Sequence, residues 1–441
     1  MCAAGRSIAM IEERDDLYGA SSPQAIAAEV YENYKKFVNP PLARVMKLSG
    51  SPVEVRARRC TIWDQNGKAY LDFAGGYGVF TLGHSHPRVL EAVRAQMELI
   101  SLSGKTMFNV LLGRAARRLA ELAPGDLQIS FWCNSGTEAI EGAIKLARAA
   151  TGRAKIVSTT DAYHGKTMGA LSVSGRESFQ SPFRPLLADS VSIPYGETNA
   201  LEEALHDAAA FVVEPVQGEG GVNIPPLGYL RSVREVCDRT KALFIADEVQ
   251  TGLGRCGYRF ACNRDEVVPD VMTLAKGLSG GVIPVGAFIA RPDVWNRAFG
   301  DAPLVHTSTF GGSEVACAAA IAAMDVLEEE GLVEQARIRG DQLLRGARAI
   351  ADGHPEVVRE ARGMGLLVGV ELTHEGYGGF IIPEMLKAGV TAAWTLNQQR
   401  VIRLEPPLVV TADEIDRALS ALRAGAATAY EKLGNLERPP S

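Results

Sequence analysis

The sequence predicts an α/β protein with a large domain, built on a mostly parallel sheet flanked by helices, and a smaller α+β domain. Two observations lead to this prediction. From about Pro87 onward, short apolar runs alternate with helix-like segments, which is typical of an open parallel sheet. Past about Ser308 this alternation gives way to long helix-like stretches followed by a few strand-like ones.

The elements of the large domain are predicted from their apolar patterns. Apolar residues at helical spacing indicate helix over 87–123, with a break near Ser103, and again over 137–150. Apolar runs indicate buried strands at 128–133, 155–158, 190–193, 211–213, 243–246, 271–274 and 285–290. Because the carboxyl ends of parallel strands meet at one edge of a sheet, we expect reactive residues that follow these runs to gather there.

The smaller domain is expected to begin near Ser308. Helix-like stretches cover 312–329 and 333–351, strand-like ones cover 357–362, 366–371 and 401–404, and a last helix starts near Asp413. We therefore expect residues 58–308 to form the large domain and 309–441 the small domain. Residues 1–57 are expected to be a segment that packs with the small domain.

Composition and charge exclude several classes of protein. The 441 residues have a net charge of -6 with mixed signs, which argues against nucleic acid as a partner. No apolar run reaches the ~18 residues of a membrane span, so no membrane partner is expected. The acidic start of the chain (Glu12, Glu13, Asp15 and Asp16) does not resemble a secretion signal. Seven cysteines without Cys-x-x-Cys spacing fit the thiols of a cytoplasmic protein, and no metal is expected.

Asp247 and Lys276 each come at the end of an apolar run that is expected to be a buried strand. A charge at that place costs desolvation free energy unless another group pairs with it. A carboxylate that keeps a pyridine nitrogen protonated and an amine that forms a Schiff base are what pyridoxal phosphate (PLP) requires. The two residues are thus compatible with PLP-dependent catalysis, although taken alone they also fit a structural ion pair. Partial desolvation of Lys276 is expected to lower its pKa, as a nucleophilic amine requires.

Three glycine-containing segments resemble nucleotide-binding loops but lack the required context. The Gly-Lys-Thr run at 165–167 has Thr160, and the run at 104–106 has Leu99, where a P-loop needs glycine. The run 252–257 has the spacing of a dinucleotide-binding loop, but no apolar-periodic helix follows it. We expect its glycines to let the backbone approach another segment closely.

Other segments allow both a functional and a structural interpretation. Residues 135–137 stand where a strand gives way to a helix, so they can bind an anion or simply cap the helix. Glu214 and Glu219 follow another strand, but no histidine accompanies them, so they make a poor metal pair. Arg403 lies on an apolar strand, where it either forms a structural ion pair or binds a substrate carboxylate through two hydrogen bonds.

The order and spacing of the motifs are more informative than any one of them. They are Phe131-Trp132-Cys133-Asn134-Ser135-Gly136-Thr137, His164-Gly165-Lys166, Gly218-Glu219-Gly220-Gly221, Asp247-Glu248-Val249-Gln250-Thr251-Gly252, the Lys276 segment, Phe310-Gly311-Gly312 and Ile402-Arg403-Leu404-Glu405-Pro406-Pro407. In this order they resemble the class III, PLP-dependent aminotransferases of fold type I, with the greatest likeness to putrescine aminotransferases. The resemblance covers about residues 53–423 and implies the fold type I architecture, with PLP as cofactor.

The resemblance implies individual roles in the cofactor site. Lys276 would form the Schiff base and move the proton, and Asp247 would pair with the pyridine nitrogen. Gln250 would bond the phenolic oxygen of the ring, and Tyr163 would stack on it. The other residues implied to bind PLP are His164, Glu214, the phosphate-binding Ser135, Gly136 and Thr137, and Thr309, which would come from the partner subunit.

The resemblance also implies the substrate site and the reaction. Arg403 would clamp the α-carboxylate of an amino or 2-oxo acid, and Glu219 would pair with Arg403 when a substrate has no carboxylate there. Tyr77, Phe80 and Trp394 are expected to line the substrate entrance. We expect ping-pong transfer of a terminal or side-chain amino group of putrescine, a polyamine or a longer-chain amine to 2-oxoglutarate or pyruvate.

The sequence leaves alternatives for the assembly, the amine substrate and the function. Because Thr309 would act in the partner's site, the resemblance implies an obligate homodimer with shared active sites, with a tetramer as the alternative assembly. Residues 101–108 differ from the run that is usual in putrescine aminotransferases, so the amine is not fixed. An acetylornithine or ornithine aminotransferase, an aminomutase and a catalytically silent PLP-fold binding protein are the alternatives.

Overall fold

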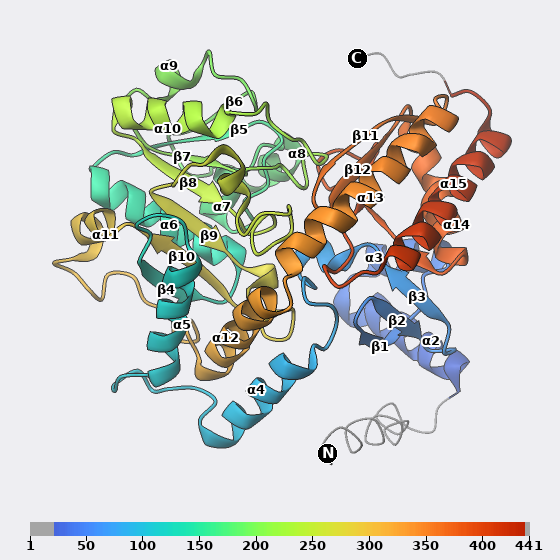
Figure 1. Ribbon diagram of the computed structural model, residues 1–441, viewed down its shortest axis with the longest axis horizontal. Coiled ribbons are helices and arrows are strands. Elements are labelled where there is room, and N and C mark those ends of the chain that lie inside the picture. Colours follow the sequence, from blue (N-terminus) through green and yellow to red (C-terminus); the bar gives the residue numbers. More distant parts are fainter. Residues whose placement is uncertain (1–21, 437–441) are drawn as a thin grey trace. The chain divides into compact units, whose positions relative to one another are not determined.

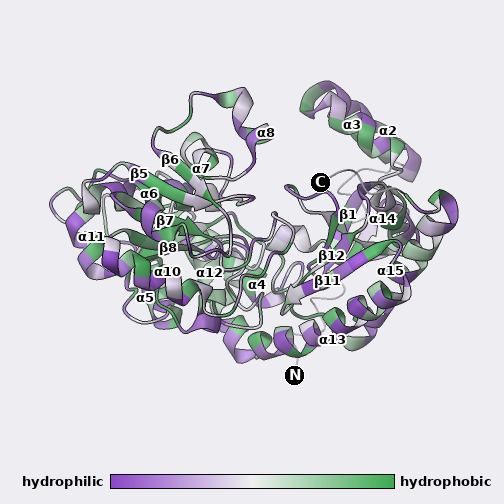
Figure 2. Cartoon of the chain, turned by 90° about the horizontal axis from the view of Figure 1, so that it is seen from above, coloured by the Kyte–Doolittle hydropathy of each residue, from purple (hydrophilic) through white to green (hydrophobic). Residues whose placement is uncertain are grey.

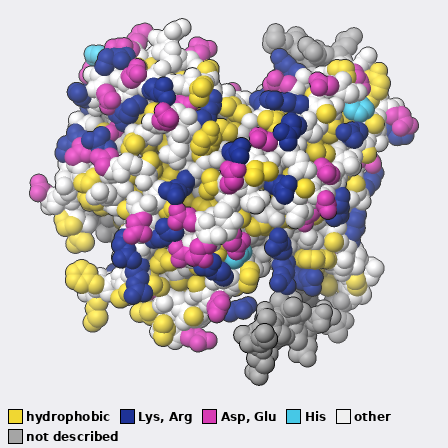
Figure 3. Space-filling view, in the orientation of Figure 1, with side chains coloured by type: hydrophobic (Ala, Val, Ile, Leu, Met, Phe, Trp, Pro, Cys, Tyr) yellow, Lys and Arg dark blue, Asp and Glu magenta, His cyan; other side chains and the backbone are white. Residues whose placement is uncertain are grey.

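The computed structural model describes residues 22–436 and divides into two compact units. Of these residues, unit 1 comprises 22–57 and 61–70, and unit 2 comprises 58–60 and 71–436. The acidic stretch at the start of the chain lies outside the described residues. None of the helices within 22–436 has the length and hydropathy that a membrane crossing needs. Figure 3 shows basic and acidic side chains intermixed over the visible face.

Unit 1 is a pair of α-helices followed by short strands. It contains α2 (Pro23–Asn33), the π-helix η1 (Tyr34–Val38), α3 (Pro40–Leu48), most of β1 (Glu54–Arg58), β2 (Thr61–Asp64) and the first half of β3 (Ala69–Asp72). Both α-helices start in the same way, with proline in the first turn after a capping residue. Ser22 accepts a hydrogen bond from the Ala25 backbone N–H at 3.2 Å, and Asn39 accepts one from Leu42 at 3.1 Å.

The largest sheet of unit 2 has seven strands in the order β4-β10-β9-β8-β7-β5-β6. These are β4 (Ile129–Cys133), β5 (Lys155–Thr159), β6 (Ser190–Ile193), β7 (Ala208–Val213), β8 (Leu243–Asp247), β9 (Val271–Leu274) and β10 (Gly286–Ala290). Strands β5 to β9 pair in parallel, whereas β10 runs antiparallel to both β4 and β9. The predicted α/β fold with a mostly parallel sheet is confirmed.

Helices cover both faces of this sheet, because its buried strands point side chains to both sides. Val212 and Ile245 belong to the core cluster formed with α6 (Gly136–Thr151) and α11 (Pro292–Phe299). Their neighbours Phe211 and Phe244 belong to the core cluster of the opposite face. Helices that contribute to that second cluster are α4 (Pro87–Leu99), α5 (Val110–Leu122), α9 (Leu201–Leu205), α10 (Tyr229–Thr240) and α12 (Glu314–Glu329). Figure 1 shows α9 and α10 beside β7 and β8, and in Figure 2 these strands are largely green.

A second sheet of unit 2 has the order β11-β12-β15-β14. Its strands are β11 (Val358–Met364), β12 (Leu367–Leu372), β14 (Ala393–Trp394) and β15 (Val401–Leu404), and the helices that follow or precede them are α13 (Leu332–Gly353), α14 (Gly378–Lys387) and α15 (Ala412–Leu433). The end of β3 pairs in parallel with β13 (Val390–Thr391). The remaining short elements are η2 (Gly75–Gly78), α7 (Met168–Ser172), α8 (Glu177–Gln180), η3 (Ser181–Phe183), η4 (Ala261–Asp265), η5 (Lys276–Ser279) and η6 (Glu375–Tyr377). The expected domain boundary at 308 stays a prediction.

Candidate active site

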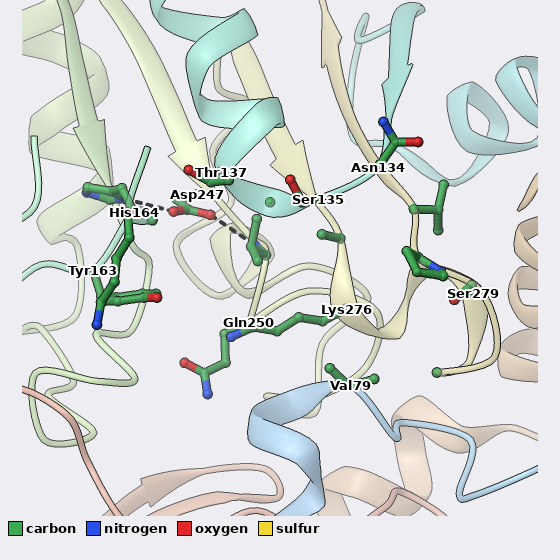
Figure 4. A pocket seen from close by; sticks show the side chains of 18 of the residues that line it. Val79, Asn134, Ser135, Thr137, Tyr163, His164, Asp247, Gln250, Lys276 and Ser279 are labelled. Carbon is green, nitrogen blue, oxygen red and sulfur yellow. Dashed lines mark hydrogen bonds and ion pairs between the residues drawn. The ribbon is translucent and has the colours of Figure 1, made fainter. Parts of the chain in front are cut away.

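A cavity of about 800 Å³ opens at the carboxyl ends of the strands of the seven-stranded sheet (Figure 4). Residues that follow β4, β5, β7, β8 and β9 line it. Residues 281–285 join them, because β10 is antiparallel and therefore starts at this edge. The cavity brings together every predicted cofactor-binding residue except Thr309, namely Ser135, Gly136, Thr137, Tyr163, His164, Glu214, Asp247, Gln250 and Lys276.

Lys276 leaves the sheet in a backbone conformation that is uncommon outside glycine. Its φ of +46° lies in the left-handed region, and it begins η5 just after the buried strand β9. Burial lowers the pKa of the Lys276 amine below its ordinary value, although the carboxylates of Glu405 and Glu219 favour the charged form. A larger neutral fraction of the amine is therefore available as a nucleophile.

Asp247, the last residue of β8, is 4% exposed. Its Oδ2 lies 2.7 Å from Nδ1 of His164. Its Oδ1 accepts hydrogen bonds from the Thr273 hydroxyl at 3.0 Å and from the Val249 backbone N–H at 3.1 Å. Burial alone would lower the pKa of His164, but the hydrogen bond and charge of Asp247 raise it above its ordinary value. The carboxylate of Asp247 is thus fixed in the cavity wall by three partners.

Glu214 is a second buried carboxyl group in this wall. Its Oε1 accepts a hydrogen bond from the Tyr163 backbone N–H at 2.9 Å, and its Oε2 accepts one from Gly218 at 3.1 Å. Burial raises the pKa of Glu214 to about 7, an effect that His164 opposes and Asp247 increases. Glu214 thereby fixes the backbone at Tyr163, whose half-buried ring lines the cavity.

The start of α6 opens into the same cavity. Ser135 caps this helix, since its hydroxyl accepts a hydrogen bond from the Glu138 backbone N–H at 3.3 Å. Gly136 is needed there because a Cβ would lie 2.8 Å from a methyl group of Val249. The hydroxyls of Thr137 and Thr167 lie 2.7 Å apart. The capping and anion-binding interpretations of 135–137 are therefore compatible, because a capped helix start still offers N–H groups to an anion.

Arg403 stands on β15 and is 1% exposed. Its Nη1 donates a hydrogen bond to Oε1 of Glu219 at 2.7 Å, and its Nε lies 3.1 Å from Oε2 of Glu405. The other oxygen of Glu219 accepts a hydrogen bond from the Leu396 backbone N–H at 2.8 Å. Burial alone would lower the pKa of Arg403, but Glu405 and Glu219 raise it. A buried guanidinium is thus neutralised by two carboxylates.

Glu405 lies beside the site and is a residue to which the sequence motifs assign no role. It is completely buried, and Nε2 of Gln250 donates to its Oε2 at 3.0 Å and its Oε1 at 3.3 Å. Glu405 therefore connects Gln250, which lines the cavity, to Arg403. The signal for it was available in the sequence, because Glu405 follows Arg403 by two positions in an extended segment and such residues share a face.

The three aromatic residues expected at the substrate entrance have different surroundings. Tyr77 is 50% exposed, and its ring centre lies 5.3 Å from the guanidinium carbon of Arg403. Trp394 is 41% exposed on β14, the strand that pairs with β15. Phe80 packs on the His84 ring at 3.8 Å between centres, and its neighbour Val79 lines the cavity.

Thr309 is exposed and does not line the cavity of its own chain. The segment that carries it is held by Lys105, whose amine donates to the carbonyl oxygens of Ser308 and Gly311. The Ser103 backbone N–H also donates to Glu314 at 2.8 Å. The segment 101–108 and the Thr309 segment therefore form one surface of the chain.

The chain is similar in sequence and structure to known transaminases. The family model described as "Aminotransferase class-III" matches residues 49–425. The ornithine aminotransferase of Toxoplasma gondii ME49 is 34% identical, with a TM-score of 0.82 over 92% of this chain and 99% of that one. An amine transaminase from an uncultivated Pseudomonas species is 30% identical, with a TM-score of 0.80 over 86% and 95% of the two chains. An (S)-enantioselective omega-transaminase from Thermomicrobium roseum is 29% identical, with a TM-score of 0.84 over 91% and 98%.

The chain belongs to the class III aminotransferase family. It is a PLP-dependent aminotransferase, and the Pseudomonas amine transaminase has been solved with PLP bound. The residues of the cavity fit this cofactor: an amine of lowered pKa on Lys276, a fixed carboxylate on Asp247, and free N–H groups at the start of α6. Two buried polar atoms at the site, Nε2 of His164 and Nη2 of Arg403, have no hydrogen-bond partner among the described residues.

Proposed function

We propose that the protein transfers a terminal or side-chain amino group from an amine, such as putrescine, a polyamine or a longer-chain amine, to 2-oxoglutarate or pyruvate. The observation that carries this proposal is the buried contact of 2.7 Å between Arg403 and Glu219. An arginine whose charge is neutralised in this way does not repel a substrate that lacks a carboxylate near the reacting carbon. The same arginine becomes a carboxylate clamp when Glu219 turns away.

The other residues of the cavity would hold the cofactor and move the proton. When bound, PLP supplies an aldehyde that takes up the amino group and a ring that stabilises negative charge at the neighbouring carbon. Lys276 would hold the cofactor through its amine and later accept and return a proton at Nζ. Asp247 would keep the ring nitrogen protonated, Gln250 would bond the phenolic oxygen and Tyr163 would cover the ring. Residues 135–137 at the start of α6 would bind the phosphate.

The exchange between two substrates would take place at Arg403. With Glu219 in place, the guanidinium is neutralised and an amine can enter. A 2-oxo acid brings its own carboxylate, which replaces that of Glu219 on the guanidinium. Because both substrates use one cavity in turn, the reaction follows a ping-pong scheme in which each half can be measured separately.

Arg403→Ala tests this proposal. We expect the variant to lose at least about a hundredfold in kcat/KM for the half-reaction with the 2-oxo acid, because it loses a buried charge-assisted clamp. The half-reaction with the amine should change by less than about fivefold, since the clamp is not used there. Glu219→Gln is the matched control, and it should impair the amine half-reaction instead. An equal loss of both halves in Arg403→Ala would contradict the proposal.

A second candidate function is ornithine or acetylornithine transamination. It is favoured by similarity, because one of the neighbours is an ornithine aminotransferase at 34% identity and another an acetylornithine aminotransferase at 32% identity. Parallel assays with putrescine, ornithine and N-acetylornithine decide between these donors. An aminomutase would need no external 2-oxo acid, and a catalytically silent PLP-fold binding protein would bind PLP without reacting with any donor.

We also propose that the protein acts as a homodimer, with Thr309 placed at the partner's phosphate site. Three apolar residues near Thr309 are exposed. Phe310, which follows Thr309, is 61% exposed, and on the neighbouring segment 101–108, Met107 is 84% exposed and Phe108 is completely exposed. Exposed apolar side chains gathered in this way are typical of a surface that another subunit covers. A tetramer would need a further surface of this kind.

A further inference from the structure

Glu405 is a completely enclosed charge near the substrate clamp. It is 0% exposed, and it contacts Arg403 at 3.1 Å and Gln250 at 3.0 Å. On its other side, its Oε1 lies 3.7 Å from Nε of Arg255, a second arginine that is also 0% exposed. One carboxylate thus serves two buried guanidinium groups and an amide.

The backbone around Glu405 is built to admit this side chain. Gly78 has a φ of +92°, and a Cβ on it would lie 2.7 Å from Oε1 of Glu405. A Cβ on Gly75 would overlap the Glu405 carbonyl oxygen. The Glu405 backbone N–H donates to the Phe73 carbonyl at 2.8 Å. The turn that carries Tyr77 is therefore wrapped closely around Glu405, so this carboxylate has little room to move.

Glu219 differs from Glu405 in how it is held. Its carboxylate contacts Arg403 and a single backbone N–H, that of Leu396. Glu405 is in addition bracketed by Arg255, which itself donates to the carbonyl oxygens of Leu366 at 3.0 Å and Pro406 at 2.5 Å. Of the two partners of Arg403, Glu219 is thus the one that can leave, and Glu405 is the one that stays.

The guanidinium of Arg403 needs a partner at every stage. If a substrate carboxylate displaces Glu219, Glu405 remains as the counter-charge 3.1 Å from Nε, so that Nη1 and Nη2 keep their direction. Nη2 has no hydrogen-bond partner among the described residues, so it can take one oxygen of a carboxylate while Nη1 takes the other. An arginine left without Glu405 would be a buried, unanchored charge at that moment.

We propose that Glu405 is a positioning residue that holds Arg403 in its carboxylate-binding orientation while Glu219 is displaced by the 2-oxo acid. This inference deepens the proposed function and rests on it. Glu405 also contacts Gln250, so the same carboxylate holds both the substrate clamp Arg403 and the amide that faces the cofactor site. A merely structural ion pair would stabilise the fold equally for both half-reactions.

Glu405→Gln tests the inference, with Glu219→Gln and Asp265→Asn as controls. Asp265 is a carboxylate that is 1% exposed and that accepts a hydrogen bond from the Leu230 backbone N–H at 3.0 Å, away from the cavity. We expect Glu405→Gln to raise KM for the 2-oxo acid about tenfold or more, as for loss of a charge-assisted contact, and to leave the amine half-reaction within about threefold. Glu219→Gln should show the opposite selectivity, and Asp265→Asn should show no selectivity.

A binding measurement without turnover completes the test. Glutarate carries two carboxylates and no reacting carbonyl, and calorimetry should show that it binds about tenfold more weakly to Glu405→Gln than to the unaltered protein. If Glu405→Gln does not fold, the double variant Arg255→Met and Glu405→Met removes the buried pair without leaving one charge alone, and the same loss is expected. Unchanged glutarate affinity, or equal losses in both half-reactions, would overturn the inference. Failure of the proposed function itself would show differently, as an unaltered protein that transaminates no amine.

Discussion

His164 contacts Asp247 over 2.7 Å between Nδ1 and Oδ2, and both side chains are buried. Asp247 receives two further hydrogen bonds, from Thr273 and Val249, so its position is fixed from three directions. The contact raises the pKa of His164 although burial opposes the rise. The charged form of His164 thus lies beside the carboxylate that we expect to pair with the pyridine nitrogen.

The variant Asp247→Asn should change both the turnover rate and the pKa of His164. An amide cannot keep the ring nitrogen protonated, so we expect kcat to fall by roughly two to three orders of magnitude. The pKa of His164 should fall as well, because burial then acts without the charge of Asp247. NMR titration of His164 measures the second effect without any turnover. An unchanged His164 titration would show that the contact does not set its charge.

Glu214→Gln should change how stability depends on pH. Burial raises the pKa of Glu214 to about 7 from its ordinary value of 4.5, so the folded protein holds this proton more tightly than the unfolded chain does. The stabilisation from this group is complete below the unfolded pKa and is lost as pH rises through the folded one. In Glu214→Gln, the decline in unfolding free energy between about pH 5 and pH 8 should therefore become shallower.

Urea unfolding of the cofactor-free protein at several pH values measures this dependence. Glu203→Gln is a suitable control, because Glu203 is exposed on α9 and should leave the pH profile unchanged. Identical pH profiles for Glu214→Gln and the unaltered protein would contradict a raised pKa for Glu214.

Lys276→Ala should abolish the covalent attachment of PLP. Borohydride reduction followed by mass spectrometry detects that attachment directly, and activity should fall by at least about a thousandfold through loss of the proton-moving amine. Lys166 is a second lysine that lines the cavity, so Lys166→Ala is the matched control and should still be labelled at Lys276. A label that persists in Lys276→Ala would place the reacting amine elsewhere.

Mixing two inactive variants tests whether Thr309 acts in the partner's site. One chain carries Lys276→Ala and the other carries Thr309→Trp, so a mixed dimer has one site with both residues unaltered. We expect co-expression to restore activity in about a quarter of all sites, because half of the dimers are mixed. If Thr309→Trp chains regain nothing in the mixture, Thr309 does not act across the dimer.

Most strands could be predicted from the sequence, because completely buried strands such as β7 form unbroken apolar runs. The direction of β10 could not, since pairing direction depends on the connection after β9 and leaves no mark in an apolar run. The short strands β1 to β3 were also missed. β1 alternates between exposed and half-buried residues and contains no apolar run.

Apart from Thr309, the residues expected to bind the cofactor line one cavity. They follow predicted strands, so the topology alone brings them to one edge of the sheet. The spacing of two residues places Glu405 on the same face as Arg403, but its contacts with Arg255 and Gln250 come from segments distant in the sequence, so no role was assigned to it. Thr309 stays a prediction, since one chain cannot show what it offers to another.

The proposed amino-group transfer can be measured by mixing the PLP form of the protein with putrescine, longer amines and ornithine, one at a time, and following the visible absorption of the cofactor. We expect at least one terminal amine to convert the cofactor to its aminated form. Addition of 2-oxoglutarate or pyruvate should then restore the original absorption. If PLP is bound but no amine or amino acid changes the absorption, the protein does not carry out the transfer proposed for it.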